Sequence, residues 1–326
     1  MQKILIIKPL WGGGVNLPNV SYCRKENEVH YNPLILQPNN EIWYTSTDGN
    51  IVEPFSDSTA PFLDVNGNNI PIISNTYKNG KGIIKLQKDC YQIGVEAFFD
   101  CTSLKSITIP DSVTTIKDSA FFGCSSLTGI TIPDSVTSIG ARAFYNCSSL
   151  TGITIPDSVT SIGNNAFRFC ILLIDITIPD SVTSIGYGAF SAWTGATSTD
   201  IINFPNEQLK IKYFENGEAF SEWKSLTSVT IPDKVTSIGA GAFRTCSKLI
   251  AIKLPENVTS IGMRAFAYCS ELTDITVLRE TPPTLGTNAF DDIASNAVIY
   301  VPSGSVYDYK FATNWSRYAN KIHAIP

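Results

Sequence analysis

The chain has 326 residues, of which 43% are apolar and only 16% are charged, against a usual charged share of about 25%. Its formal net charge of −5 comes from 24 basic and 29 acidic residues, so it lacks the basic surplus that neutralises nucleic-acid phosphates. The two histidines, His30 and His323, lie at opposite ends of the chain, which leaves little for a histidine-centred triad or a multi-histidine metal site. We therefore expect no nucleic-acid partner, no enzymatic activity, no cofactor, and no catalytic, cofactor-binding or metal-ligating residues.

No apolar run approaches the roughly 20 residues that a membrane helix needs. The apolar stretch at residues 4–7 is interrupted by Lys8 and Pro9, and it is too short for the centre of a secretory signal. We expect no membrane insertion, and no signal peptide is visible.

Residues 1–83 do not repeat, and they predict an N-terminal all-β module. Turn dipeptides lie between strand-like runs at Asp48-Gly49, Asn66-Gly67 and Asn79-Gly80. Such dipeptides are typical of β-hairpins. A solenoid end has an unpaired edge, so we expect part of this module to cover the first repeat. For residues 1–40 three roles are open: a linker, an attachment arm or a second binding module.

Residues 84–290 repeat with a step of 23 residues. Ala-Phe pairs mark the repeats, and they begin at Ala97, Ala120, Ala143, Ala166, Ala189, Ala219, Ala242, Ala265 and Ala289. Within one unit, Ile130-Thr131-Ile132 alternates as a half-buried strand does and Pro133 ends it, while Gly140 predicts a sharp turn. A unit of this size buries its apolar side only against stacked neighbours. The sequence therefore predicts a β-rich solenoid of about nine to ten coils.

One coil, at residues 190–219, is seven residues longer than its neighbours. Insertions in repeats map to loops and often form the binding face. Aromatic residues lie in or beside this insertion at Trp193, Phe204, Tyr213, Phe214 and Trp223. Two interpretations are open: the rings fill the larger core of a longer coil, or they contact a ligand. These five residues are therefore candidate binding residues.

Residues 291–326 predict a C-terminal strand-helix cap. Residues 298–301 have the pattern of a last strand, and Ser305 is a suitable N-cap for a helix over residues 306–319. Apolar residues with core spacing follow at Phe311, Trp315, Tyr318 and Ile322. We expect this segment to cover the last coil.

Six of the eight cysteines occupy the same place in their coils. They are Cys101, Cys124, Cys147, Cys170, Cys246 and Cys269. Stacking places equivalent residues about 4.8 Å apart with parallel Cα–Cβ bonds, whereas a disulfide needs its Cβ atoms to converge to about 3.8 Å. Trp193 and Trp223 take this place in two coils, which suits a buried apolar position better than a metal site. We predict reduced, buried cysteines.

Two further columns of residues recur. Carboxylates follow the prolines at Asp111, Asp134, Asp157, Asp180, Asp233 and Glu256. We interpret Pro-Asp-Ser as a turn whose aspartate accepts hydrogen bonds from nearby amides, with calcium as a minor alternative because one carboxylate per coil supplies few ligands.

Threonines recur on the strands at Thr108, Thr131, Thr154, Thr177, Thr230 and Thr276. Strand preference alone explains them. A second interpretation is that they form a flat, nearly uncharged contact surface. Thr131, Thr154 and Thr177 are its candidate residues.

The repeat resembles the BspA-like leucine-rich repeats. Their signature is present as Leu150-Thr-Gly-Ile-Thr-Ile-Pro-Asp-Ser-Val-Thr-Ser-Ile-Gly163, followed by Ala166-Phe167 and Cys170. The resemblance spans about residues 84–290, and it implies a curved solenoid without enzymatic activity. It also implies adhesion and protein binding at the surface of host-associated bacteria and some protists. Similar repeats occur in proteins carried by gut bacteriophages.

We therefore expect a non-enzymatic, adhesin-like leucine-rich repeat protein that binds a protein or glycan ligand on another cell or particle. By resemblance its location is the cell surface or the extracellular space. The alternative is a bacteriophage virion component, a fibre or receptor-contacting part. In that case the N-terminal segment is an attachment arm and a route to oligomers.

Overall fold

The computed structural model describes residues 22–25, 28–31, 37–54, 60–173, 176–194, 199, 202–203 and 206–326. The chain forms two compact units, Met1–Pro38 and Asn39–Pro326. In the first unit, β1 (Tyr22–Lys25) and β2 (Glu28–Tyr31) pair antiparallel. The second unit holds the repeats together with residues 39–83, so this boundary differs from the one expected at residue 83.

The second unit begins with antiparallel strands. β3 (Glu41–Ser46) pairs with β6 (Lys81–Leu86), which pairs with β5 (Ile72–Lys78). Asn79 and Gly80 join β5 to β6 with positive φ angles of 53° and 79°, as a two-residue hairpin turn requires. β3 also pairs antiparallel with β8 (Leu104–Thr108), and β4 (Phe62–Leu63) pairs antiparallel with β7 (Gln92–Ile93).

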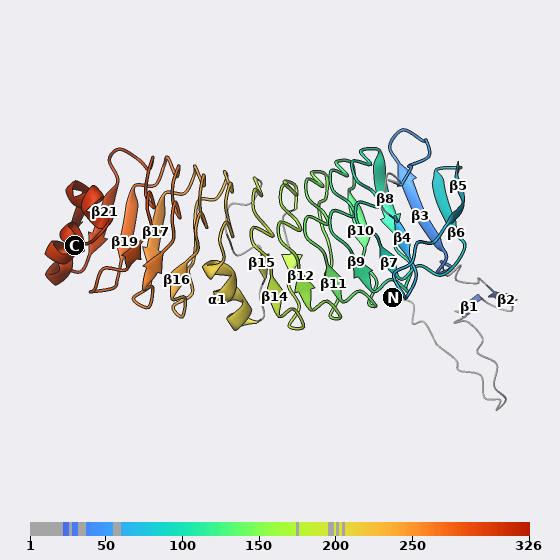
Figure 1. Ribbon diagram of the computed structural model, residues 1–326, viewed down its shortest axis with the longest axis horizontal. Coiled ribbons are helices and arrows are strands. Elements are labelled where there is room, and N and C mark those ends of the chain that lie inside the picture. The colour runs from blue at the N-terminus through green and yellow to red at the C-terminus, as the bar shows by residue number, and fades with distance from the viewer. Residues whose placement is uncertain are drawn as a thin grey trace, which may run out of the picture. The chain divides into compact units, whose positions relative to one another are not determined.

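The chain then winds in stacked coils, whose parallel strands fall into two sets (Figure 1). The serine side consists of β7, β9 (Thr115–Ile116), β11 (Ser138–Ile139), β12 (Ser161–Ile162) and β14 (Ser184–Ile185), and then of β16 (Ser237–Ile238), β18 (Ser260–Ile261) and β20 (Thr284–Leu285). The threonine side consists of β8, β10 (Gly129–Thr131), β13 (Ile176–Thr177), β15 (Ile202–Asn203), β17 (Ala251–Leu254), β19 (Asp274–Val277), β21 (Val298–Val301) and β22 (Ile322–Ala324). The β-rich repeat solenoid predicted from the sequence is confirmed.

The apolar core runs along the coils as a ladder of phenylalanines. Each ring stacks on its equivalent in the next coil, with centroids 5.2 to 5.7 Å apart, in the series Phe98, Phe121, Phe144, Phe167 and Phe190 and in the series Phe220, Phe243, Phe266 and Phe290. All are buried, and each contributes about 1.5 to 3 kcal/mol by leaving water.

The glycine that follows most serine-side strands has a different role from the one predicted; after β9 this place is taken by Lys117. Gly140 and Gly163 do not have positive φ angles; Arg142 and Asn165, two positions further on, do. A Cβ atom at Gly163 would lie closer than 3.0 Å to the backbone of Ala141 in the preceding coil. Glycine is therefore needed for the close approach of two backbones and not for the turn itself.

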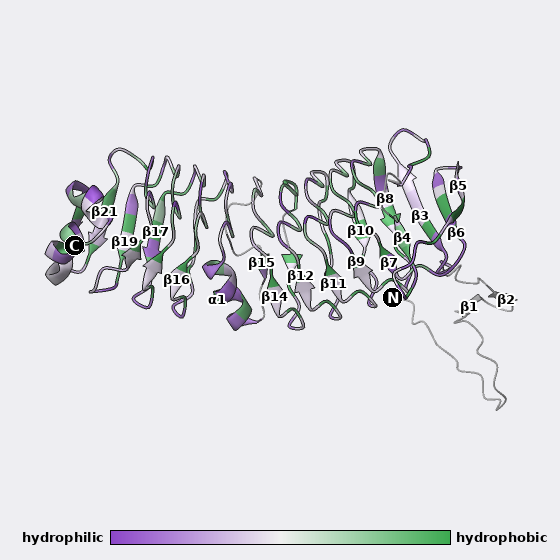
Figure 2. Cartoon of the chain, in the orientation of Figure 1, coloured by the Kyte–Doolittle hydropathy of each residue, from purple (hydrophilic) through white to green (hydrophobic). Residues whose placement is uncertain are grey.

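The long coil contains a helix, α1 (Glu207–Glu215), where the insertion predicted a loop. Asn206 caps it, because its side chain accepts a hydrogen bond from the Leu209 N–H. The helix buries Leu209, Ile211, Tyr213 and Phe214. Figure 1 places it beside the serine side between β14 and β16, and Figure 2 shows that it is otherwise hydrophilic.

The C-terminal segment differs from the single helix expected over residues 306–319. It forms a 3₁₀ turn, η2 (Ser303–Ser305), a short helix, α2 (Val306–Phe311), and a second 3₁₀ helix, η3 (Trp315–Lys321). Asn314 separates the last two because its φ is 64°. Ser305 makes no side-chain capping bond, and Phe311 is exposed. Trp315, Tyr318 and Ile322 are buried as predicted.

Candidate functional site

Four of the five candidate aromatic residues lie in the core. Trp193, Tyr213, Phe214 and Trp223 are at most 1% exposed, and the two indole rings stack 5.6 Å apart. Phe204 lies outside the described residues. The interpretation of these four as ligand contacts is therefore wrong, because the longer coil encloses a larger core and they fill it.

The indoles also replace a hydrogen bond that the cysteines make. In regular coils the thiol donates to a phenylalanine carbonyl of the preceding coil, as Cys147 does to Phe121 and Cys170 to Phe144, both at 3.2 Å. Nε1 of Trp193 donates to the Phe167 carbonyl at 2.9 Å, and Nε1 of Trp223 to the Phe190 carbonyl at 2.6 Å. This position thus needs a buried donor as well as apolar bulk.

The cysteines of the described coils are free thiols. The set comprises Cys90, Cys101, Cys124, Cys147, Cys170, Cys246 and Cys269. Burial raises the pKa of Cys269 to about 12, and it raises the pKa of Cys147 well above its usual range. A neutral buried thiol is a poor nucleophile and a poor metal ligand. Within the described residues, no three histidine, cysteine or acidic side chains gather where they could hold a metal ion.

In the Pro-Asp-Ser turns, the serine hydroxyl makes the hydrogen bond that links the turn to the preceding coil. The Val136 N–H donates to the Pro133 carbonyl at 3.0 Å, which closes the predicted turn. The Ser135 hydroxyl donates to the Val113 carbonyl of the preceding coil at 2.6 Å. Asp134 is exposed and its carboxylate accepts no hydrogen bond from the described residues, so the amide bonds expected for the aspartate are not present.

The candidate threonines lie on consecutive coils of the threonine side, and all three are exposed. In the part of the chain that the structure describes, the hydroxyls of Thr131 and Thr154 make no hydrogen bond, and Thr177 accepts one from Asn203 at 3.4 Å.

A second exposed threonine column on the serine side provides a contrast. Thr137, Thr160 and Thr183 donate their hydroxyls to carbonyls of the preceding coil at 3.2 Å. Thr131 and Thr154 are therefore the ones whose hydroxyls are available to a partner.

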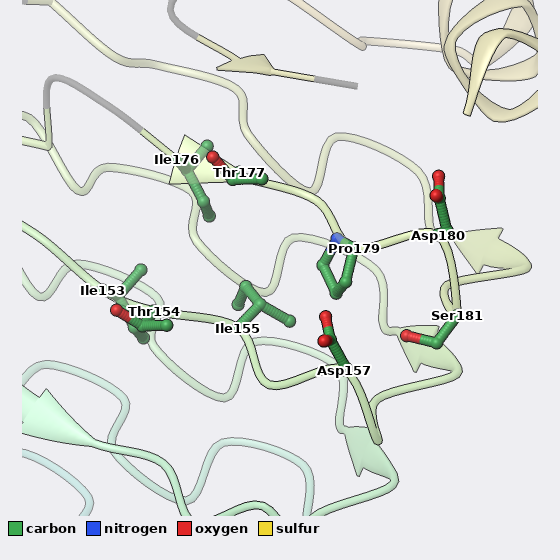
Figure 3. Close-up of a pocket in the computed structure, with 9 residues that line it drawn as sticks. All are labelled: Ile153, Thr154, Ile155, Asp157, Ile176, Thr177, Pro179, Asp180 and Ser181. Carbon is green, nitrogen blue, oxygen red and sulfur yellow. The ribbon is translucent and has the colours of Figure 1, made fainter. Parts of the chain in front are cut away.

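An open pocket of about 650 Å³ lies between the coils of Thr154 and Thr177 (Figure 3). Its lining comprises Ile153, Thr154, Ile155, Asp157, Ile176, Thr177, Pro179, Asp180 and Ser181. Ile155 and Ile176 are buried and give it an apolar floor, while the exposed carboxylates of Asp157 and Asp180 lie beside Pro179 (Figure 3). The pocket thus combines apolar surface, hydroxyls and two negative charges.

The pocket coincides with a break in the threonine-side ladder. β10 pairs with β8 and β13 pairs with β15, but residues 152–155, between β10 and β13, form no strand. On the serine side the same coils stay paired through β11, β12 and β14. The coils are therefore joined by strand pairing on the serine side, whereas residues 152–155 take no part in strand pairing on the threonine side.

A polar cluster at the insertion has a structural explanation. Arg168 contacts Glu218 at 2.8 Å and Glu222 at 2.6 Å, across the intervening coil. Two carboxylates neutralise one guanidinium in a largely buried setting. The cluster therefore links the coils through two ion pairs and offers no anion site.

No helix in the described part is long and apolar enough to span a membrane.

The chain resembles solved structures of bacterial proteins, including the following three. The leucine-rich repeat protein TpLRR from T. pallidum is 30% identical, with 50% of this chain and 73% of that chain covered and a TM-score of 0.43. A leucine rich cell surface protein from Faecalibacterium prausnitzii is 24% identical, with 78% and 89% covered and a TM-score of 0.45. A leucine-rich repeat protein from Bacteroides ovatus is 23% identical, with 85% and 98% covered and a TM-score of 0.34.

The repeats themselves carry the family assignment. No curated protein matches the chain. The BspA type leucine-rich repeat region matches in six copies over residues 74–197 and 216–314, which is more than half of the chain. The interval between the two stretches contains all of α1, the part of the long coil that departs from the repeat. The chain therefore belongs to the family of proteins with BspA-type leucine-rich repeats.

Proposed function

We propose that the chain is a non-enzymatic, adhesin-like binding protein whose partner is a protein or glycan on another cell or particle. The observation that carries this proposal is the surface formed by Thr131, Thr154 and Thr177 around the open pocket. It is exposed on three consecutive coils, and the hydroxyls of Thr131 and Thr154 make no hydrogen bond to a described residue. Stacked repeats create extended surfaces of this kind, which repeat proteins use for binding. We also propose a location at the cell surface, in line with the family resemblance.

The chemistry of this surface defines the partner. The Ile155 and Ile176 floor suits an apolar group, and the hydroxyls of Thr131 and Thr154 suit polar groups of either sign. Asp157 and Asp180 favour hydroxyl or basic groups over acidic ones, because a carboxylate is a strong acceptor and repels anions.

The first and last coils of a solenoid have unpaired strand edges that must be covered. We therefore propose nine to ten coils with a cap at each end. The pairing of β3 with β8 supports the N-terminal cap. Trp315 supports the C-terminal cap, because it is fully buried and its ring lies 5.9 Å from that of Phe290.

The test is to add charge to each threonine column in turn. The variant T131K/T154K/T177K alters the proposed surface, and T137K/T160K/T183K alters the serine side as a matched control. Fluorescently labelled full-length chain is incubated with intact epithelial cells and with bacterial cells, and the bound fraction is counted by flow cytometry. We expect the first variant to lose tenfold or more of the binding and the control to keep it. Equal binding by both variants, with both shown to be folded by thermal melting, would contradict the proposal.

A second candidate is a virion component with the N-terminal segment as its attachment arm. It is supported by the separation of Met1–Pro38 as a unit of its own. Light scattering after size exclusion, on the full chain and on residues 39–326, separates the candidates. A monomer in both cases favours the adhesin-like protein. A trimer that becomes monomeric on truncation favours the virion component.

A further inference from the structure

The C-terminal segment exposes two large aromatic side chains that the core does not use. Tyr307 is 71% exposed and Phe311 is 70% exposed. They lie one turn apart on α2, with ring centroids 4.6 Å apart and planes tilted by 38°. Two exposed rings in contact form an apolar surface patch, and such patches mark binding sites on soluble proteins. We name Tyr307 and Phe311 the aromatic platform.

A pocket of about 870 Å³ opens beside the aromatic platform. One wall is formed by residues 280–282, and residues 302–305 also line the pocket. Two side chains hold the loop that carries the first wall. The Tyr309 hydroxyl donates to the Arg279 carbonyl and Nε1 of Trp315 donates to the Pro283 carbonyl, both at 2.7 Å. The wall is therefore fixed before any ligand arrives, as binding pockets usually are.

The rim of the pocket carries hydroxyls and carboxylates. They belong to Thr281, Ser303, Tyr307, Glu280 and Asp308. Neither carboxylate is ion-paired or hydrogen-bonded to a described residue, and the described lining contains no lysine, arginine or histidine. Carboxylates accept strong hydrogen bonds from hydroxyl groups, and two uncompensated negative charges repel an anionic ligand.

We propose that the aromatic platform and its pocket bind a neutral saccharide. A pyranose has an apolar C–H face, which the negative face of an aromatic ring attracts. It also has hydroxyl groups around its edge, and these can donate hydrogen bonds to the Glu280 and Asp308 carboxylates. A proline-rich peptide needs an aromatic-lined groove, whereas both rings here lie on a single helix. The platform lies on α2 and does not involve the surface around Thr154, so this inference does not depend on the proposed function.

The test uses the full-length chain and a printed array of neutral, sialylated and sulfated oligosaccharides. The neutral oligosaccharide that binds best is then titrated by calorimetry into the parent chain and its variants. We expect Y307A and F311A each to weaken binding tenfold or more, and D308N to weaken it several-fold. Y268A is the matched control, because Tyr268 is 45% exposed on another coil; it should bind as the parent does. Because the Tyr307 and Phe311 rings are exposed, the variants Y307A and F311A should have melting temperatures close to that of the parent.

Three results would overturn the proposal: no neutral oligosaccharide is bound, only acidic oligosaccharides are bound, or Y307A and F311A bind as Y268A does. Binding of an arginine-bearing proline-rich peptide that depends on Tyr307, without saccharide binding, would assign the platform to a protein partner instead. The variant T131K/T154K/T177K should bind the oligosaccharide normally, which separates a failure of this inference from a failure of the proposed function.

Discussion

Two glycines within 11 residues of each other have opposite requirements. A Cβ atom at Gly163 would collide with the backbone of Ala141 in the preceding coil, whereas a Cβ atom at Gly152, in the break of the threonine-side ladder, would meet no atom within 4 Å. Neither glycine has a positive φ, so the difference between them is packing alone.

Alanine at these two positions should therefore give different stabilities. Gly163→Ala is expected to lower the free energy of unfolding by about 1 to 3 kcal/mol or more, because the backbones must separate to admit a methyl group. Gly152→Ala should change it by less than about 0.5 kcal/mol. Urea unfolding followed by circular dichroism measures both. Equal midpoints for the two variants would show that the coils are not in close backbone contact at Gly163.

The buried thiols make stability depend on alkaline pH. Burial raises the pKa of Cys124, Cys147 and Cys170 above the usual range, so the folded chain keeps protons that the unfolded chain loses above pH of about 8.5. The stabilisation is complete below the unfolded pKa and is lost as the pH rises towards the folded pKa. We expect the free energy of unfolding to fall by about 1 to 2 kcal/mol per buried thiol by pH 10.

Urea titrations at pH 7.5, 9 and 10 test this expectation, with the variant C147A/C170A as the comparison. The variant should have the lower stability at pH 7.5 and the shallower decline with pH, because it has two fewer thiols to titrate. Parallel declines for the two chains would exclude the thiols as the cause.

At the scale of elements, α1 and the C-terminal segment each lie where the next regular coil would lie. Both use side chains to make the hydrogen bonds that the backbone of that coil would make. In regular coils the phenylalanine N–H donates to the alanine carbonyl of the next coil, as Phe144 does to Ala166. Where the repeat is interrupted, a tyrosine hydroxyl is the acceptor at 3.2 Å, Tyr213 for Phe190 and Tyr318 for Phe290. Asparagine side chains donate to the strands in the same way, Asn216 to Ile185 and Asn314 to Leu285. The insertion thus contacts the coil before it as the C-terminal segment contacts the last coil.

Tyr213→Phe tests this view of the insertion. The Tyr213 hydroxyl accepts from the Phe190 N–H and donates to the Ala219 carbonyl at 2.6 Å. Its loss leaves two buried backbone groups without partners, at about 1 to 3 kcal/mol each, so thermal unfolding should shift clearly downwards. Tyr145→Phe is the control, because the Tyr145 hydroxyl makes no hydrogen bond to a described residue and should contribute less than about 0.5 kcal/mol. Equal shifts for the two variants would contradict the bridging role.

Features of this fold are predictable from sequence where their physical cause repeats. The coils and the buried cysteine position follow from residues that recur every 23 positions. Helix α1 occurs once, and its buried residues at 209, 211, 213 and 214 do not follow a helical period. The pocket beside Thr154 is not predictable either, because Ile153-Thr154-Ile155 has the same sequence as Ile130-Thr131-Ile132 and only the backbone pairing distinguishes them. The break between α2 and η3 depends on the single left-handed residue Asn314.

For the whole molecule, the constant register of the regular coils makes each of them a removable unit. Ser138 pairs with Ser161, and Ile139 with Ile162, so each residue of these coils lies beside its equivalent 23 positions away. Deletion of residues 140–162 joins Ile139 to Gly163, which restores the Ile-Gly sequence of an intact coil. Every later residue then finds an equivalent neighbour.

We expect this 23-residue deletion to fold as a solenoid shorter by one coil and to melt cooperatively at a lower temperature, because it lacks one interface between neighbouring repeats. The 22-residue deletion of residues 141–162 is the control. It leaves one extra residue at the junction, and a slip of one residue turns the apolar side chains of a strand away from the core. Circular dichroism melts and size exclusion compare the two chains. A control that melts as sharply as the 23-residue deletion would show that stacking tolerates a change of register, and loss of folding in the 23-residue deletion would show that the coils are not interchangeable.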